Sequence, residues 1–214
     1  MKVAPSLLTA DFLHLEKDVR MVDEHADLIH LDIMDGTLVP NISFGFSIID
    51  PVSTIARKPM DTHLMVVHPE RWFERLAGDG VSTVTFHLEA SGRNTSANIE
   101  RIHALGMKAG VAINPDIPVS RLYPYIGKAD MFLIMSVFAG FGGQKFIYES
   151  LDRIAQLRSE MERRGCKGLI EVDGGVSSAN CSALRQAGAD VLVAGSSVFK
   201  AEDPMAAMAA LRQA

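Results

Sequence analysis

The order of secondary-structure patterns constrains this chain more than any single motif does. Eight short segments rich in apolar and β-branched residues alternate with longer segments whose apolar residues recur at helical spacing. Expected strands lie at residues 2–6, 27–33, 60–65, 82–87, 108–113, 130–135, 168–173 and 190–195. Strands that alternate with helices form parallel sheets, because each helix returns the chain to the end of the sheet where the previous strand began.

The helical segments support the same fold class. Amphipathic patterns cover residues 11–25, 69–80, 148–165 and 178–188. Several helical segments end in glycine, a usual helix stop, at Gly80, Gly106, Gly165 and Gly188. A chain of 214 residues has room for eight strand–helix units. We therefore predict an α/β fold, a single (β/α)8 TIM barrel over residues 1–214; the uneven spacing leaves a doubly wound sheet as the alternative.

Composition excludes several classes of function. The net charge is −5 and no basic stretch stands out, which argues against nucleic-acid binding. No apolar run approaches the roughly 20 residues of a membrane span, and Asp11 interrupts the N-terminal apolar run too early for a signal peptide. Cys166 and Cys181 lack metal or redox spacing and fit free thiols in a reducing compartment. We expect a cytoplasmic protein with no nucleic-acid or membrane partner.

Polar residues gather at the expected C-terminal ends of the strands, where a barrel of this kind builds its active site. His30 and Asp32 share one face of their strand, because strand side chains alternate between faces. His63 lies late in the next strand, and Asp173 ends the strand at residues 168–173. Two imidazoles and two carboxylates suit Zn, Mn, Fe(II) or Co. These four residues predict a site for one divalent metal ion.

For other residues near the same strand ends, the sequence leaves two roles open. Methionines at the same level predict an apolar pocket wall, although core packing is the ordinary role of methionine: Met34, Met65 and Met135. Asp61 and Glu171 lie one inward position below His63 and Asp173. Either they orient the metal ligands, or they pair with Lys108 or His87, and the sequence leaves both readings open.

Glycine-containing loops follow the last three expected strands, with the sequences AGFGGQKF, DGGVSS and AGSSVF. Glycine lets backbone N–H groups approach an anion closely, and barrels commonly hold a phosphate at the loops after strands 7 and 8. The residues predicted to surround a phosphate are Gly174, Gly175, Gly195 and Ser196, with Gly142 and Gly143 closing over it.

These segments together resemble the ribulose-phosphate 3-epimerase family over essentially the whole chain. The resemblance is carried, in the family's order, by APSLLTADF, HLDIMDGTLVPNISFG, DTHLMV, GFGGQKFI, EVDGGV and AGSSVFK. It implies a TIM-barrel isomerase, a homo-oligomer, that uses one divalent metal ion to interconvert the small phosphorylated ketoses D-ribulose 5-phosphate and D-xylulose 5-phosphate.

The resemblance also implies roles for individual residues. It makes His30, Asp32, His63 and Asp173 the metal ligands, and Asp32 and Asp173 the two carboxylates that move protons. The implied substrate contacts are Ser6, His63, Gly140, Phe141, Gly142, Gly143, Gly174, Gly175, Gly195 and Ser196.

One position departs from the family's pattern. Phe138 and Ala139 stand where the family usually has Asn-Pro, or an acid followed by Pro, before GFGG. Losing the proline frees one φ angle and adds one N–H donor, and Phe138 adds bulk. The departure leaves open a six-carbon substrate such as D-allulose 6-phosphate, whereas DGGV and GSSVF favour the five-carbon sugar.

Two other classes of protein fit less well. A metal-independent phosphate-binding lyase needs the pattern Asp-x-Lys-x-x-Asp, but Ile33 and Met34 follow Asp32, so the lysine is missing. A non-catalytic sugar-phosphate sensor needs the glycine loops but not two histidines and two aspartates at one rim.

Overall fold

Eight parallel strands form one sheet, in the order β1-β8-β7-β6-β5-β4-β3-β2. They are β1 (Lys2–Pro5), β2 (Ile29–Met34), β3 (Met60–Met65), β4 (Thr83–His87), β5 (Lys108–Ile113), β6 (Met131–Met135), β7 (Leu169–Asp173) and β8 (Val191–Ala194). The computed structural model describes residues 1–213. Each strand falls within a residue or two of its expected range, so the predicted strand positions are confirmed.

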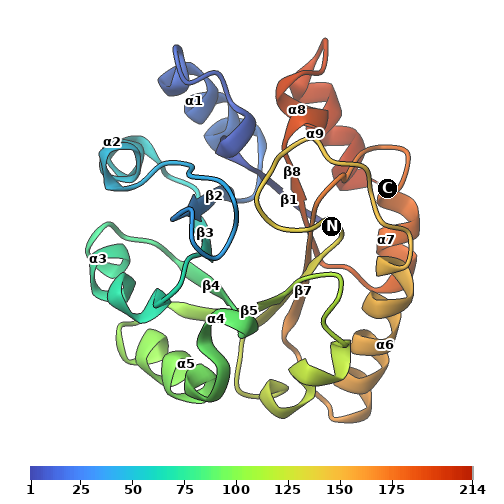
Figure 1. Cartoon of the computed structure of the whole chain (residues 1–214). Coiled ribbons are helices and arrows are strands. Elements are labelled where there is room, and N and C mark those ends of the chain that lie inside the picture. Colours follow the sequence, from blue (N-terminus) through green and yellow to red (C-terminus); the bar gives the residue numbers. More distant parts are fainter. Residues whose placement is uncertain (214) are drawn as a thin grey trace.

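The sheet curls round until its two edge strands meet. An isolated parallel bridge joins Ser6, just after β1, to His30 in β2. The N–H groups of Asp27 and Leu28 also donate to the carbonyl oxygen of Val3, at 3.1 and 3.3 Å. Figure 1 shows the strands at the centre with the helices around them. The barrel is nearly closed, so the predicted TIM-barrel fold is confirmed and the doubly wound alternative is wrong.

Helices cover the outside of the barrel. The α-helices are α1 (Leu15–His25), α2 (Phe46–Ile55), α3 (Phe73–Gly78), α4 (Leu88–Ser91), α5 (Thr95–Ala104), α6 (Ser150–Arg163), α7 (Cys181–Ala187), α8 (Ser196–Phe199) and α9 (Pro204–Gln213). Short 3-10 helices are η1 (Leu7–Thr9), η2 (Pro69–Arg71), η3 (Gly92–Asn94) and η4 (Val119–Tyr125). Between β5 and β6 the chain forms η4, which contains Pro124, a residue unfavourable inside an α-helix.

Local hydrogen bonds explain where α1 begins. The amphipathic pattern starts at residue 11, but the helix starts at Leu15. The carboxylate of Asp11 accepts the N–H of Leu13 at 3.0 Å and contacts the His14 ring at 2.8 Å. An aspartate that bonds the backbone two residues ahead forms a turn, which delays the helix.

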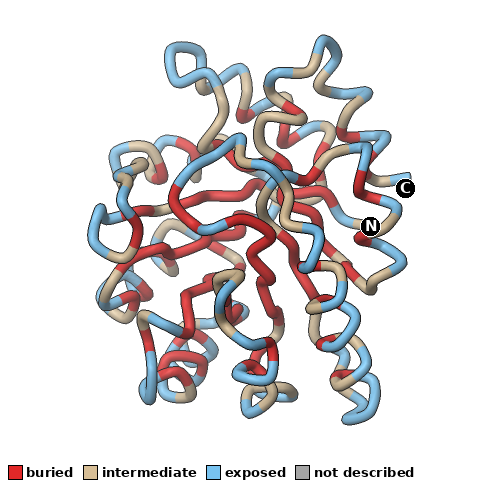
Figure 2. Tube along the Cα trace, turned by 45° about the vertical axis from the view of Figure 1, so that its right-hand side comes forward, coloured by how far each residue is buried: buried red, intermediate tan, exposed pale blue. Residues whose placement is uncertain are grey.

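The core has an outer and an inner part. Between strands and helices, side chains such as Leu31, Phe86 and Leu157 are buried. Inside the barrel, one apolar group lies near the C-terminal strand ends and includes Met34, Met65, Ala112, Leu133 and Met135. A second one, built from Ala4, Met131, Val191 and Val193, is also buried. Figure 2 shows the strands as mostly buried and the helices exposed on their outer sides. Within residues 1–213, every helix is too short or too polar to cross a bilayer.

Candidate active site

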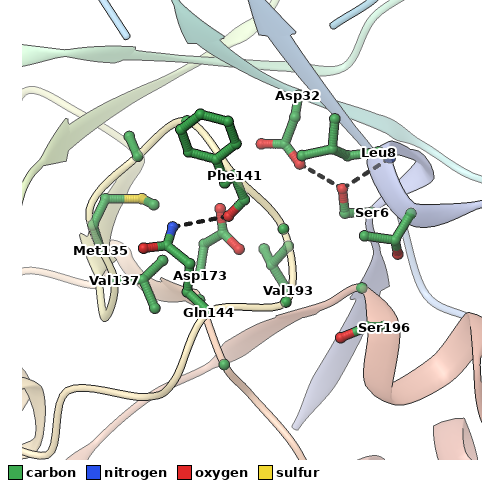
Figure 3. A pocket seen from close by; sticks show the side chains of 18 of the residues that line it. Ser6, Leu8, Asp32, Met135, Val137, Phe141, Gln144, Asp173, Val193 and Ser196 are labelled. Atoms are coloured by element: carbon green, nitrogen blue, oxygen red, sulfur yellow. Dashed lines mark hydrogen bonds between the residues drawn. The ribbon is translucent and has the colours of Figure 1, made fainter. Parts of the chain in front are cut away.

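A cavity lies at the C-terminal mouth of the barrel, as Figure 3 shows from close by. Most of the predicted site residues line it: Ser6, Asp32, Met34, Met65, Met135, Gly140, Phe141, Gly142, Gly143, Asp173, Gly174, Gly175, Gly195 and Ser196. His30 and His63 are completely buried, with 0% of their surface exposed, and lie against Asp32. The structure therefore brings together every residue that the sequence placed in the site.

The four predicted metal ligands converge from three strands. Each offers one nitrogen or oxygen atom, and these atoms all lie within 4.8 Å of one another. His63 Nδ1 is 3.1 Å from Asp32 Oδ1 and 3.6 Å from Asp173 Oδ2. His30 Nε2 is 3.4 Å from Asp32 Oδ1. Each ring thus turns one nitrogen toward Asp32, and the same nitrogen of His63 also faces Asp173.

Strand register explains this convergence. In the β2–β3 pair, Asp32 lies opposite His63, and His30 lies opposite Asp61. Residues opposite each other on the same face of neighbouring strands are close enough for their side chains to touch. Asp173, the last residue of β7, reaches the same level from the other side of the barrel. The alternation of faces therefore points all of these side chains into the barrel.

Asp61 orients one of the histidines. Its Oδ2 lies 2.8 Å from His30 Nδ1, and both side chains are almost completely buried. This contact places hydrogen on Nδ1 and leaves Nε2 free to act as a ligand. His30 Nε2 is buried and has no hydrogen-bond partner among the described residues. Of the two readings left open for Asp61, the contact fits the orientation of a metal ligand, and the ligand that Asp61 contacts is His30.

Glu171 lies in the same buried layer without a hydrogen bond. Its Oε1 is 3.9 Å from His30 Nδ1, and neither carboxyl oxygen has a hydrogen-bond partner within residues 1–213. Burial and then the charge of Asp61 raise the pKa of Glu171 well above its ordinary value. This shift favours the neutral form of Glu171, which lowers the cost of a second buried charge beside Asp61.

The electrostatics of the four-residue cluster call for positive charge at its centre. Burial raises the pKa of Asp32, but attraction to His30 and His63 outweighs burial and lowers it. Burial lowers the pKa of His30, yet Asp32 and Asp61 raise it well above the ordinary value. For His63, Asp173 and Asp32 likewise outweigh burial and raise the pKa.

The ionised carboxylates therefore attract either protons on the rings or a cation between them. Two imidazole nitrogens, one of them the unpartnered Nε2 of His30, and two carboxylates match the donor set of Zn, Mn, Fe(II) or Co. The residues present fit a divalent metal ion.

His87 belongs to this site although the sequence reading did not include it. Its Nε2 lies 2.9 Å from His63 Nε2, and the two rings stack with centroids 5.0 Å apart. Burial lowers the pKa of His87, so the ring is neutral. His87 is the last residue of β4, so the same strand-end position that marked His63 and Asp173 would have found it.

Ser6 links the first strand to Asp32. Its Oγ donates to Asp32 Oδ2 and accepts the N–H of Leu8 at 3.2 Å, as the dashed lines in Figure 3 mark. The serine thereby caps η1 and fixes one oxygen of Asp32.

Glycines in the loops after β7 and β8 occupy positions where a side chain would not fit. Gly174 has φ +117°, which side-chain-bearing residues rarely adopt, and a Cβ there would collide with Val137. At Gly195 a Cβ would come within 2.9 Å of Thr9 Oγ1. Val137 and Thr9 also line the cavity, so a larger residue at either position would collide with its wall.

Three side chains hold the loop between β6 and α6. Asn114 Oδ1 accepts the N–H of Ala139 at 3.0 Å, and Asn41 Nδ2 donates to the carbonyl oxygen of Gly140 at 2.7 Å. Gln144 Nε2 donates to the carbonyl oxygens of Phe138 and Phe141, at 2.7 and 2.9 Å. A proline at position 139 would lack the N–H that donates to Asn114, so this hydrogen bond depends on the departure from the family's pattern.

The rings of Phe138 and Phe141 are about half exposed at the mouth of the cavity. Phe141 lines the cavity together with Asp32 and Asp173, and Figure 3 labels all three.

Comparisons with known proteins agree with this geometry. Residues 2–199 match the profile of the "Ribulose-phosphate 3 epimerase family". A ribulose-phosphate 3-epimerase of Synechocystis sp. is 43% identical over 98% of this chain and 92% of its own length. The Bacillus subtilis ribulose-phosphate 3-epimerase is 40% identical over 99% of this chain and 98% of its own length. A crystal structure of 3-hexulose-6-phosphate synthase superposes with a TM-score of 0.73 over 100% of this chain and 99% of that chain, at 20% identity, which shows a shared fold.

Proposed function

The chain belongs to the ribulose-phosphate 3-epimerase family of isomerases acting on carbohydrates, and on that basis we propose that it interconverts D-ribulose 5-phosphate and D-xylulose 5-phosphate. The observation that carries the proposal is the meeting of Asp32 and Asp173 at the floor of a cavity whose upper part is lined by glycine loops. Curated relatives named ribulose-phosphate 3-epimerase support the five-carbon substrate.

The reaction needs two groups that exchange protons with one carbon. Epimerisation beside a ketone removes a weakly acidic C–H proton and returns a proton to the opposite face. Asp32 and Asp173 come from different strands and both face the cavity, so each can serve one face of a flat intermediate. Met34, Met65 and Met135 line the same cavity and keep water from the reacting carbon.

A divalent metal ion is part of the proposal. His30 Nε2, His63 Nδ1 and the carboxylates of Asp32 and Asp173 would hold it. When bound, it supplies Lewis-acid stabilisation of the negative charge that develops on the substrate oxygens, an effect worth several kcal/mol. Asp61 keeps His30 in the tautomer that can act as a ligand, and Ser6 fixes the orientation of Asp32.

The phosphate of the substrate would lie between the loops that follow β7 and β8. Gly174, Gly175, Gly195 and Ser196 line that part of the cavity. Backbone N–H groups in such loops bind anions without a cationic side chain. The loop after β6, with Gly142 and Gly143, would close over the bound sugar.

One assay tests the proposal. Purified protein is given D-ribulose 5-phosphate or D-allulose 6-phosphate, and inversion at C3 is followed with and without exhaustive chelation. We expect turnover of the five-carbon sugar, its loss after chelation, and its return on addition of Zn, Mn, Fe(II) or Co. Full activity in protein shown to be metal-free would overturn the metal requirement. Preference for D-allulose 6-phosphate would favour the second candidate function, a 3-epimerase of a six-carbon ketose phosphate. The observation that favours this candidate is the half-exposed ring of Phe138 at the mouth of the cavity.

A further inference from the structure

The contact between His63 and His87 requires one shared proton. Their Nε2 atoms are 2.9 Å apart, and both side chains are completely buried. At that distance, one nitrogen carries hydrogen and donates while the other accepts. The opposite nitrogen of His63, Nδ1, faces Asp32 and Asp173. The two nitrogens of His63 therefore have separate partners.

These contacts determine the tautomer of both rings when Nδ1 of His63 binds a metal ion. His63 then carries its hydrogen on Nε2 and donates it to His87 Nε2. His87 must in turn carry its own hydrogen on Nδ1. That nitrogen is buried and has no hydrogen-bond partner within residues 1–213, and the carboxylate oxygen Glu89 Oε1 lies 3.5 Å from it.

Glu89 is held in place for this task. It lies in α4, two residues after His87, and its side chain is 22% exposed. Its Oε1 also accepts the backbone N–H of Asn114 at 3.0 Å. The backbone N–H of Asn114 always donates, because a peptide N–H does not change its protonation state. It therefore holds the Glu89 carboxylate in place and takes no proton from it. Glu89 can therefore favour hydrogen on Nδ1 of His87 over hydrogen on Nε2.

We propose that His87 and Glu89 are positioning residues that hold His63 in the tautomer and orientation that bind the metal ion, an inference that rests on the metal site of the proposed function. The protein orients its two histidine ligands in different ways. Asp61 contacts His30 directly, at 2.8 Å, whereas Glu89 acts on His63 through the ring of His87. A partner of this kind typically changes metal affinity by about 10–100-fold when it is removed.

Glu89→Gln tests the proposal with little change in shape. The amide oxygen can still accept the N–H of Asn114, but the carboxylate that favours hydrogen on His87 Nδ1 is gone. Zinc affinity is measured by competition with a chelator, and we expect about 10–100-fold weaker binding. Glu89→Asp should restore part of the affinity. Glu100→Gln, which removes an equal charge from an exposed position on α5, should leave zinc affinity unchanged.

Nitrogen NMR of the imidazole rings gives a readout that a packing role would not move. In the zinc-loaded wild type, we expect His87 to be protonated at Nδ1 and unprotonated at Nε2. In Glu89→Gln, this pattern should shift toward a mixture of tautomers. Thermal melting of both variants verifies that the barrel is folded.

The outcomes separate this inference from the proposed function. If Glu89→Gln binds zinc within twofold of the wild type and keeps its His87 tautomer, the positioning role is wrong while the metal site stands. If the wild type binds no divalent metal ion, the metal site of the proposed function fails and the inference fails with it.

Discussion

Asp32 and Asp173 differ in the number of their contacts and in their exposure to solvent. Asp32 accepts from Ser6 Oγ, contacts His63 at 3.1 Å and has a side chain that is 4% exposed. Asp173 lies 3.6 Å from His63 Nδ1, and its side chain is 17% exposed. Asp32 is therefore held by more contacts with neighbouring side chains than Asp173 and is less accessible to solvent.

The first prediction concerns which carboxylate serves which face of the substrate. Asp173→Asn keeps an oxygen for the metal ion but cannot carry a proton. We expect it to lose epimerisation by about 10²–10⁴-fold or more, because both half-reactions are needed for inversion. Asp32 would still remove the C3 proton of one epimer, which should exchange slowly with deuterated water. Asp32→Asn should exchange the other epimer.

Metal content has to be measured first in both variants, because each changes a predicted ligand. A one-base mechanism gives a different pattern, in which one aspartate is dispensable and the other serves both epimers. Near-wild-type inversion by metal-loaded Asp173→Asn, or equal exchange of both epimers, would contradict the two-base assignment.

At the scale of elements, the loop between β6 and α6 is tied to its neighbours by specific hydrogen bonds. Asn114, which follows β5, accepts from Ala139, and Asn41, which follows β2, donates to Gly140. Gln144 spans the loop from within. Such side-chain bonds to a loop backbone determine how often the loop opens.

The second prediction changes this loop toward the family's usual pattern. Phe138→Asn with Ala139→Pro removes a ring from the mouth and the N–H that Asn114 accepts, while proline restricts φ. We expect the Michaelis constant or the five- versus six-carbon preference to change more than metal content does.

Asn114→Ala is the matched control, because it breaks the same hydrogen bond and leaves Phe138 in place. Similar kinetics in the two variants would assign the effect to the hydrogen bond. A change only in the double variant would assign it to the ring or the proline. Unaltered kinetics for both sugars in both variants would mean that this loop does not set specificity.

At the scale of the whole molecule, much of the site followed from the sequence because a parallel barrel collects its C-terminal strand ends. Period-two alternation identified the inward faces, and strand order brought those faces together. The pairing of particular side chains depends on register and ring orientation, which alternation does not determine. For that reason the contacts of Asp61 with His30 and of His63 with His87 became clear only in the structure.

The barrel also has a seam, and the metal site spans it. The sheet runs from β1 through β8 and β7 round to β2, and the seam is the place where β2 meets β1 again. Among the described residues, the bridge between Ser6 and His30 and a few backbone hydrogen bonds join these two strands. Asp173 belongs to β7 on one side of this seam, whereas Asp32 and His63 belong to β2 and β3 on the other. A metal ion held by all of them would connect the two sides.

The third prediction is that metal binding stabilises the barrel and protects this seam. At a free metal concentration about 100 times the dissociation constant, binding adds about 2.7 kcal/mol to the free energy of unfolding. For a chain of this length that corresponds to a rise in Tm of roughly 5–10 °C. Amide hydrogen exchange should slow more in β1 and β2 than in β4 and β5. His63→Gln, which removes one ligand, should show a smaller rise at the same metal concentration. Equal protection of all strands would mean that the ion stabilises the barrel as a whole and not the seam in particular. An unchanged Tm with metal demonstrably bound would mean that the unfolded chain binds the ion as well.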